Sequence, residues 1–151
     1  MNRIFVDLEM HPVALEYVQE RTIFKFETIE VGAVMLDERY EEIGSFCEYV
    51  KPLYSEVILP RYEELTGITT QMVAEADPFP QVLERFTEWC GEDYTMYSWS
   101  KADLNQIRGE CRLKGIKPDE KLTYMLRHWK DFQKEFSRLV GIHHPIKLEE
   151  A

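Results

Sequence analysis

The sequence predicts a single α/β domain, residues 1–151, with helices packed on a mixed sheet. Two observations support this prediction. Three segments rich in β-branched residues follow one another through short links in the first third of the chain, whereas helical periodicity alternates with short strand-like runs in the remainder. A chain of 151 residues that is 44% hydrophobic can bury a substantial core. Repeats, low-complexity tracts and internal linkers are absent.

The first third of the chain is expected to form three strands. Residues 2–9 alternate apolar and polar side chains, and this first strand is expected to end at His11-Pro12. The mixed, charged segment 13–27 is expected to be a loop or a short helix. Residues 28–37 and 41–52 give the second and third strands. Because the second link is short, the three strands are expected to form an antiparallel meander.

Helices follow after Pro60. Residues 65–76 contain a turn at Gly67 and a short helix that Thr69 can cap. Residues 77–91 give the clearest helix, with Asp77 as the candidate N-cap, Pro78 in the first turn and Gly91 after the last turn. Its apolar residues follow helical spacing; they are Phe79, Val82, Leu83, Phe86, Trp89 and Cys90.

The remaining elements alternate between strand and helix. Residues 94–99 are expected to form a strand and residues 102–115 a helix that Gly115 closes. Residues 121–129 are expected to hold the last strand, and residues 131–141 the last helix, which ends at Gly141. The order predicts a mixed sheet of five strands.

Composition excludes several classes of protein. No run of about 18 apolar residues is present, which excludes a membrane span, and the N-terminus lacks the features of a signal peptide. Three widely spaced cysteines match neither a zinc motif nor a disulfide framework, so we expect reduced core thiols in a cytoplasmic protein. A net charge of −10 argues against binding along a duplex. It is compatible with binding a short nucleic-acid end, especially with cations present.

Three carboxylates form the candidate site. Asp7 and Glu9 share one face of the first strand, and Asp103 begins a helix directly after a later strand. These side chains can converge at one edge of the sheet, where their oxygens suit Mg²⁺ or Mn²⁺. Bound cations would also offset the repulsion between the carboxylates. The alternatives are a solvated edge strand for Asp7 and Glu9, and helix capping for Asp103.

Four segments in order carry a family resemblance: FVDLEM, ETIEVGAVML, LTGITTQMVAEADPFPQVLERFTEW and YSWSKADLNQI. Together they resemble the DEDD-type 3′→5′ exonucleases, in the branch that includes histone-mRNA and small-RNA trimming enzymes and their bacterial relatives. The resemblance implies a ribonuclease H-like fold with a five-stranded mixed sheet. It also implies two divalent cations, Mg²⁺ or Mn²⁺, and the 3′ end of single-stranded RNA or DNA as substrate.

The resemblance assigns roles to residues of the matching segments. It makes Asp7, Glu9 and Asp103 the catalytic, metal-binding carboxylates, with Asp7 bridging both ions. It implies substrate contacts by seven further residues, namely Leu8, Met10, Leu65, Thr66, Ile68, Trp99 and Ser100. The alternative for Met10, Leu65 and Ile68 is a place in the core, and for Trp99 simple packing. Glu30 is interpreted as structural support.

The third motif of the family, a histidine followed five positions later by an aspartate, is not found. His144 and Glu149 have the right interval, but Pro145 interrupts any helix there. We therefore hypothesise that the domain is truncated before this motif, which supplies the general base and the fourth carboxylate. Three functions follow as hypotheses: a 3′→5′ exonuclease, with RNA favoured and with impaired activity; a non-catalytic module that binds nucleic-acid ends or a protein; and a phosphodiesterase for small nucleotides.

Overall fold

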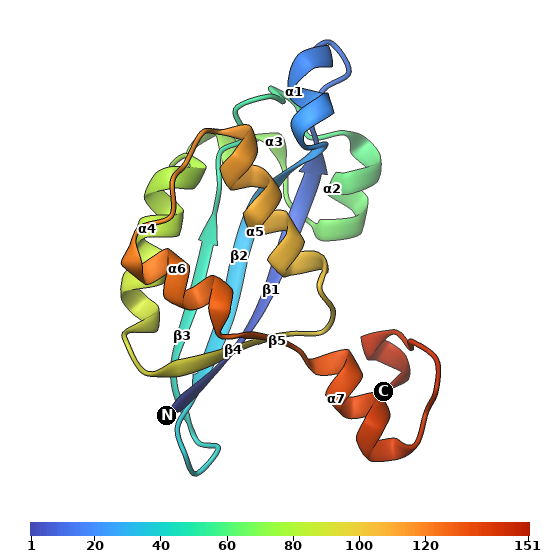
Figure 1. The fold of residues 1–151 in the computed structure, drawn as a ribbon. Helices are drawn as coiled ribbons and strands as arrows, with labels where there is room; N and C mark the ends of the chain where they lie inside the picture. The colour runs from blue at the N-terminus through green and yellow to red at the C-terminus, as the bar shows by residue number, and fades with distance from the viewer.

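A mixed five-stranded sheet in the order β3-β2-β1-β4-β5 forms the centre of the computed structural model, which describes residues 1–151 (Figure 1). Strands β1 (Asn2–Pro12), β2 (Phe26–Leu36) and β3 (Glu42–Tyr49) form an antiparallel meander, as predicted. Strands β4 (Tyr94–Ser98) and β5 (Trp129–Asp131) extend the sheet in parallel with β1. The mixed sheet expected from the sequence is confirmed.

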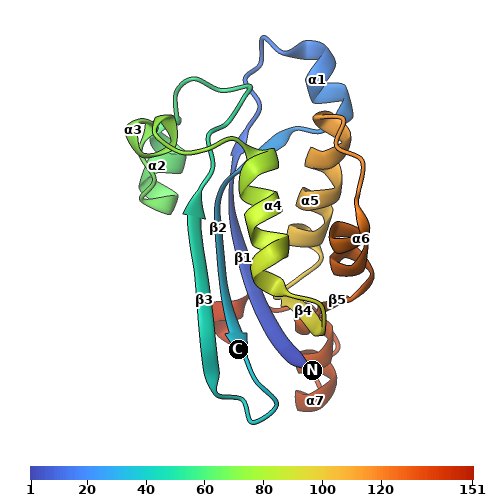
Figure 2. The same ribbon diagram turned by 90° about the vertical axis from the view of Figure 1, so that its left-hand side faces the viewer.

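The helices fall into three groups. One face of the sheet is covered by α4 (Phe79–Cys90), α5 (Ala102–Leu113) and α6 (Glu120–Arg127) (Figure 2). Three short helices gather where β1 ends; they are α1 (Val18–Ile23), α2 (Pro60–Thr66) and α3 (Thr70–Ala74) (Figure 1).

The third group is α7 (Phe132–Val140), with a 3-10 turn at Leu148–Glu150. Phe132 of α7 packs edge-on against Phe5 and Tyr97, whose rings stack on each other across β1 and β4.

The core lies between the sheet and the helices α4, α5 and α6. Ile4, Val6 and Leu8 of β1 enter it, and it contains 18 buried residues. A second cluster of four buried residues lies beside α2 and α3; it consists of Ile29, Ile58, Ile68 and Val73. Burial of these side chains stabilises the fold by roughly 1.5–3 kcal/mol for each large aliphatic residue.

Two expectations about elements are wrong. Of the expected strand 121–129, residues 121–127 lie in helix α6, because the Asp119 side chain caps its first turn and Leu122 and Met125 are buried at helical spacing. The strand of this region is β5, and it has three residues. Pro78, not Asp77, is the N-cap of α4. The Asp77 carboxylate instead pairs with Arg85 at 2.9 Å.

Helix α2 was not expected from the sequence. It begins at Pro60, which suits the first helical position, and ends before Gly67, whose φ of 74° is left-handed. The turn at Gly67 and the cap by Thr69 are confirmed. None of the helices has the length and apolar composition that crossing a membrane requires.

All three cysteines are free. Cys90 and Cys111 are buried, which confirms the expectation of core thiols for these two. Cys47 is exposed on β3, and the expectation is wrong there, because its side chain lies on the sheet face that α4, α5 and α6 leave uncovered.

Candidate active site at the unpaired edge of strand β1

Two of the predicted carboxylates lie on the face of the sheet opposite α4, α5 and α6. Because apolar residues of β1 point into the core, strand alternation places Asp7 and Glu9 on the opposite face. Asp7 is exposed and Glu9 is half-buried. Their partners across the ladder in β2 are Gly32 and Glu30. Since Gly32 has no side chain, the surface beside Asp7 stays open.

The third carboxylate reaches the same strand from α5. Strand β4 pairs with β1 only from Asn2 to Phe5, so the following residues of β1 have no strand partner on that side. Asp103, in the first turn of α5, occupies this edge, and its Oδ1 accepts a hydrogen bond from the Leu8 backbone N–H at 3.0 Å. Asp103 is only 7% exposed. The fold therefore holds Asp103 beside the strand that carries Asp7 and Glu9.

Loss of solvent, together with negative charge near Glu9 and Asp103, disfavours the ionised forms of the three carboxylates. Burial raises the pKa of Asp103 to about 6; the Leu8 N–H lowers it, and the charge of Asp7 raises it further. Partial loss of hydration beside the sheet also raises the pKa of Asp7, although its side chain stays exposed. Burial is the largest cause of the raised pKa of Glu9, and the negative charges of Asp7, Glu30 and Asp103 raise it further. This set of oxygens would be stabilised by positive charge.

The chemistry of these donors fits a divalent cation of the Mg²⁺ type, which prefers carboxylate oxygens. In the structure, no three His, Cys, Asp or Glu side chains converge closely enough to hold an ion together. One oxygen of Asp103 is engaged by Leu8. Asp7, Glu9 and Asp103 are the carboxylates that could contribute oxygen ligands to such an ion.

Glu30 lies next to the candidate site. The sequence alone suggested structural support for Glu30, and it did not reveal that Glu30 is the neighbour of Glu9. It lies opposite Glu9 in the ladder between β1 and β2, and the Cys47 thiol donates to its Oε1 at 3.5 Å. Its charge raises the pKa of Glu9. The signal was the register of the two strands, which a single sequence does not reveal.

The predicted substrate contacts differ in accessibility. Leu8 and Ile68 are buried, and Ile68, 1% exposed, is part of the second core cluster, so the core alternative holds for its side chain. Met10 is partly buried against the main core. Leu65 is 76% exposed at the end of α2, so the core alternative is wrong for it. Thr66 donates its hydroxyl to the Tyr62 carbonyl at 2.7 Å.

Trp99 and Ser100 connect β4 to α5. The Trp99 ring packs against Phe132 and Phe136 of α7, and its Nε1 donates to the Ile146 carbonyl at 3.0 Å. The Ser100 hydroxyl oxygen accepts from the Ala102 N–H at 3.2 Å. Trp99 is therefore packed against α7 in this structure, and Ser100 supports the start of the helix that carries Asp103.

No histidine is among the groups that shift the pKa values of the three carboxylates. His11, only 2% exposed, accepts from the Leu59 N–H at 3.0 Å through Nε2. His128 stacks on Tyr124. His143 and His144 are exposed beyond α7, and Pro145 lies outside any helix, as expected.

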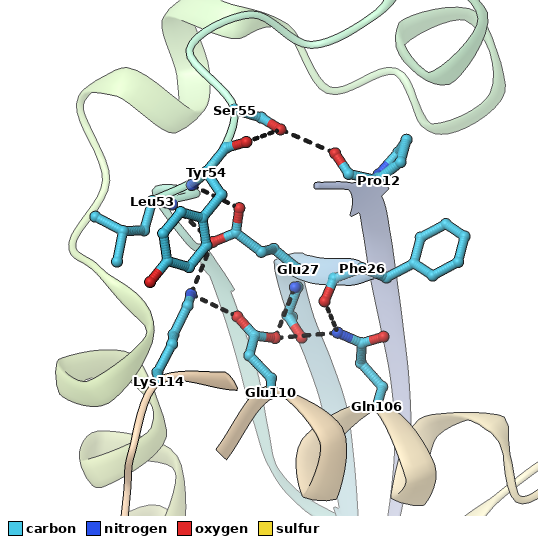
Figure 3. A network of polar contacts seen from close by, with 10 residues as sticks. Pro12, Phe26, Glu27, Leu53, Tyr54, Ser55, Gln106, Glu110 and Lys114 are labelled. Carbon is cyan, nitrogen blue, oxygen red and sulfur yellow. Dashed lines mark hydrogen bonds and ion pairs between the residues drawn. The ribbon is translucent and has the colours of Figure 1, made fainter. Parts of the chain in front are cut away.

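A buried polar network fixes the other end of α5 (Figure 3). Lys114 Nζ lies 2.9 Å from Glu27 and 2.7 Å from Glu110, and all three side chains are almost fully buried. Glu27 accepts the backbone N–H groups of Leu53 and Tyr54 at 2.7 and 2.8 Å. The Thr28 N–H donates to Glu110 at 2.8 Å. Sequence reasoning missed this network; the spacing of Glu110 and Lys114 was its only local signal.

The sheet order is that of an exonuclease domain with the ribonuclease H-like fold. The model of the exonuclease family RNase T matches residues 4–150. This chain belongs to that family, as its four motif segments predicted.

Curated relatives include both RNA- and DNA-associated proteins. The chain is 35% identical to mouse 3′-5′ exoribonuclease 1 over 105 residues, which is 62% of this chain and 30% of the relative. It is 39% identical to the human 3′-5′ exoribonuclease 1, again over 62% of this chain and 30% of the relative. A DNA polymerase III of the PolC type from Listeria monocytogenes is 27% identical over 77% of this chain and 9% of the polymerase. The chain thus spans less than a third of the length of these relatives.

Solved structures share the fold. The nuclease domain of 3′hExo, a DEDDh family member bound to rAMP, superposes with a TM-score of 0.77 at 23% identity, over 93% of this chain and 71% of that one. Product-bound exonuclease I superposes with a TM-score of 0.68 at 17% identity, over 98% of this chain and 35% of the exonuclease I chain. At these identities the likeness describes the fold.

Proposed function

We propose that this chain is a 3′→5′ exonuclease that hydrolyses phosphodiester bonds at the 3′ ends of single-stranded nucleic acid with the help of Mg²⁺ or Mn²⁺. The observation that carries the proposal is the hydrogen bond between Asp103 and the Leu8 N–H. It ties the carboxylate of one motif to the strand segment of the other, between Asp7 and Glu9. Membership of an exonuclease family supports the same reaction.

The chain's own residues have distinct tasks in this proposal. Asp7, Glu9 and Asp103 would hold the cations, which when bound polarise the phosphate and lower the pKa of a bound water. The Leu8 N–H fixes the orientation of Asp103. Leu65 offers an exposed apolar side chain to the terminal nucleotide, and Met10 offers a partly buried one. Leu8, Thr66, Ile68, Trp99 and Ser100 would line or support the same groove.

RNA is the favoured substrate. Relatives named as exoribonucleases are 35–40% identical to this chain, whereas the PolC-type DNA polymerases are 27–28% identical. Matched RNA and DNA oligonucleotides of one sequence test this preference, and faster shortening of the DNA would contradict it.

The activity of residues 1–151 is proposed to be low. A positioned general base contributes about 10²–10⁴-fold to such reactions, and none of the histidines forms a hydrogen bond or ion pair with the three carboxylates; His11 and His128 bond to Leu59 and Tyr124 instead. The same observation favours a second candidate, a non-catalytic module that binds nucleic-acid ends. Imidazole added to the buffer can replace a missing base, so it should raise the rate of a true but impaired enzyme.

The test uses a 5′-labelled single-stranded oligonucleotide with Mn²⁺. We expect stepwise shortening from the 3′ end, which stops on chelation and falls by roughly 100-fold or more in Asp7→Ala, because a metal ligand is lost. Exposed Glu92, whose side chain forms no ion pair in the structure, provides the matched control, Glu92→Gln, which should keep full activity. Equal residual shortening by Asp7→Ala and the parent chain would rule out the proposed site.

Metal binding is measured separately from cleavage. We expect Mn²⁺ to raise the unfolding temperature of the parent chain and of Glu92→Gln, but not of Asp7→Ala. Binding of Mn²⁺ and oligonucleotide without shortening, with or without imidazole, would favour the non-catalytic module.

A further inference from the structure

A cavity of about 480 Å³ beside α7 has an unusual charge for this acidic molecule. Nine residues line it. Two are lysine or arginine, two are histidine and none is aspartate or glutamate; the nine are Gln133, Lys134, Ser137, Arg138, Gly141, Ile142, His143, His144 and Pro145. The chain as a whole carries 28 acidic against 18 basic residues. The cavity is therefore a local positive region on a protein with a net charge of −10.

The two full charges at this cavity have no carboxylate partner. Lys134 and Arg138 are four residues apart on α7, so their side chains share one side of the helix. Both are exposed, and neither is within 4.0 Å of an acidic group; the acidic residue of the helix, Glu135, pairs instead with Lys130 at 3.9 Å.

The helix dipole accounts for only one of these two charges. A cation near a helix C-terminus is favourable, and Arg138 lies in the last turn of α7. Lys134 lies in the first turn, where the positive end of the dipole disfavours a cation. Its position is thus not explained by the stability of the helix.

The cavity continues toward the candidate active site. A second cavity, of about 690 Å³, shares Gln133 and Pro145 with the first and extends to Trp99 and Ser100, directly before the helix of Asp103. Its charged lining residues are Lys147, Glu149 and Glu150, so the positive charge without acidic neighbours is confined to the first cavity. Gln133 Nε2 and Trp99 Nε1 both donate to the Ile146 carbonyl, at 2.5 and 3.0 Å. These bonds hold the shared wall in place. The shared wall therefore joins the Trp99 side of the second cavity to Lys134 and Arg138 of the first.

We propose that this cavity binds backbone phosphates of the single-stranded substrate, upstream of the 3′-terminal nucleotide. The inference rests on the proposed exonuclease function, because it names the same substrate. Carboxylates dominate the rest of the surface and repel a polyanion, so a long strand needs a positive contact to stay bound. Lys134 and Arg138 supply that contact, with His143 and His144 as further donors.

The test is the salt dependence of binding. A fluorescent single-stranded oligonucleotide is titrated in Mg²⁺ with an Asp7→Asn background, which suppresses cleavage. Adding Lys134→Gln with Arg138→Gln should flatten the slope of log K against log salt by about 1.4, since each single-strand phosphate contact contributes about 0.7. Over a fourfold range of salt this corresponds to about sevenfold in affinity.

The matched control changes the same charges at the same spacing elsewhere. Arg108 and Arg112 are exposed and four residues apart on α5, so Arg108→Gln with Arg112→Gln should leave the slope unchanged. Unfolding temperatures confirm that all variants fold. An identical slope in the cavity variant and the control, or no binding by the background chain, overturns the inference.

Shortening assays, in chains with Asp7 intact, separate this inference from the proposed function. The cavity variant should raise the KM for a long oligonucleotide and leave hydrolysis of a dinucleotide unchanged, because a dinucleotide does not reach the cavity. If the chain shortens oligonucleotides and the cavity variant binds them normally, the inference alone is wrong. If binding depends on the cavity but no shortening occurs, the proposed function alone is wrong.

Discussion

At the scale of single residues, the candidate site combines carboxylates in different environments. Asp7 is exposed to solvent, Glu9 is half-buried and Asp103 is nearly excluded from water. Only Asp103 has a fixed hydrogen-bond partner, the Leu8 N–H. It therefore bears the largest electrostatic strain in the absence of a cation, with a pKa raised to about 6. Such a cost at a functional position is typical of sites where stability is given up for activity.

Asp103→Asn is expected to stabilise the metal-free protein above pH 6. The folded state holds the Asp103 proton more tightly than the unfolded state, since its pKa rises from 3.8 to about 6. The stability associated with the protonated group is therefore present below pH 3.8 and is lost as the pH rises through 6. Asparagine keeps an oxygen for the Leu8 N–H but carries no charge. Urea unfolding at neutral pH should show a gain of up to about 3 kcal/mol.

This prediction is checked by comparing the unfolding free energies of Asp103→Asn and the parent chain at several pH values. The stability that Asp103→Asn gains over the parent chain should grow between pH 4 and pH 6 and then level off, because Asp103 of the folded parent chain ionises with a pKa of about 6. Glu92→Gln should show no such growth, because Glu92 is exposed. A constant offset between Asp103→Asn and the parent chain over this range would show that Asp103 titrates normally.

At the scale of elements, long periodic segments were predictable, whereas the short elements α2, α6 and β5 were not. The strand alternation of residues 2–9 and the helical spacing of residues 77–91 identify β1 and α4, because each buries one regular face. Helix α6 was mistaken for a strand, since eight residues with two buried side chains give little periodicity. Strand β5 has only three residues and depends on its pairing with β4. For the site, Asp7, Glu9 and Asp103 could be found from their motifs, whereas Glu30 required the register.

The contact between α1 and α5 depends on a glycine. A side chain at Gly109 of α5 would collide with the Phe24 ring, which follows α1. Gly109→Ala is therefore expected to destabilise the protein by about 1–3 kcal/mol in chemical unfolding. The sign should reverse in a Phe24→Ala background, because alanine is favoured over glycine in a helix by up to about 1 kcal/mol. Destabilisation of equal size in both backgrounds would contradict a collision with Phe24.

At the scale of the whole molecule, α5 is attached to the sheet by polar groups at both ends. Asp103 accepts from β1 at its start, and Glu110 with Lys114 connects its end to Glu27 of β2 (Figure 3). Glu27 in turn holds the backbone of the segment that leads to α2. The position of the candidate site therefore depends on a network that lies outside it.

Lys114→Met tests how much this network contributes. Burial lowers the pKa of Lys114, but the charges of Glu110 and Glu27 raise it by more, so the amine is charged and neutralises both carboxylates. Its removal leaves two buried carboxylates unpaired, and we expect a loss of about 3–5 kcal/mol at neutral pH.

A surface cluster provides the matched comparison for Lys114→Met, since Arg85 also joins two carboxylates, Glu48 and Asp77, at 2.6 and 2.9 Å. Arg85→Met should cost less than about 1 kcal/mol of stability, because solvent screens these pairs. Urea unfolding decides between the two, and a similar loss in both variants would mean that burial does not set the strength of the network. Adding Glu110→Gln to Lys114→Met should recover part of the loss, because it removes one of the two uncompensated charges.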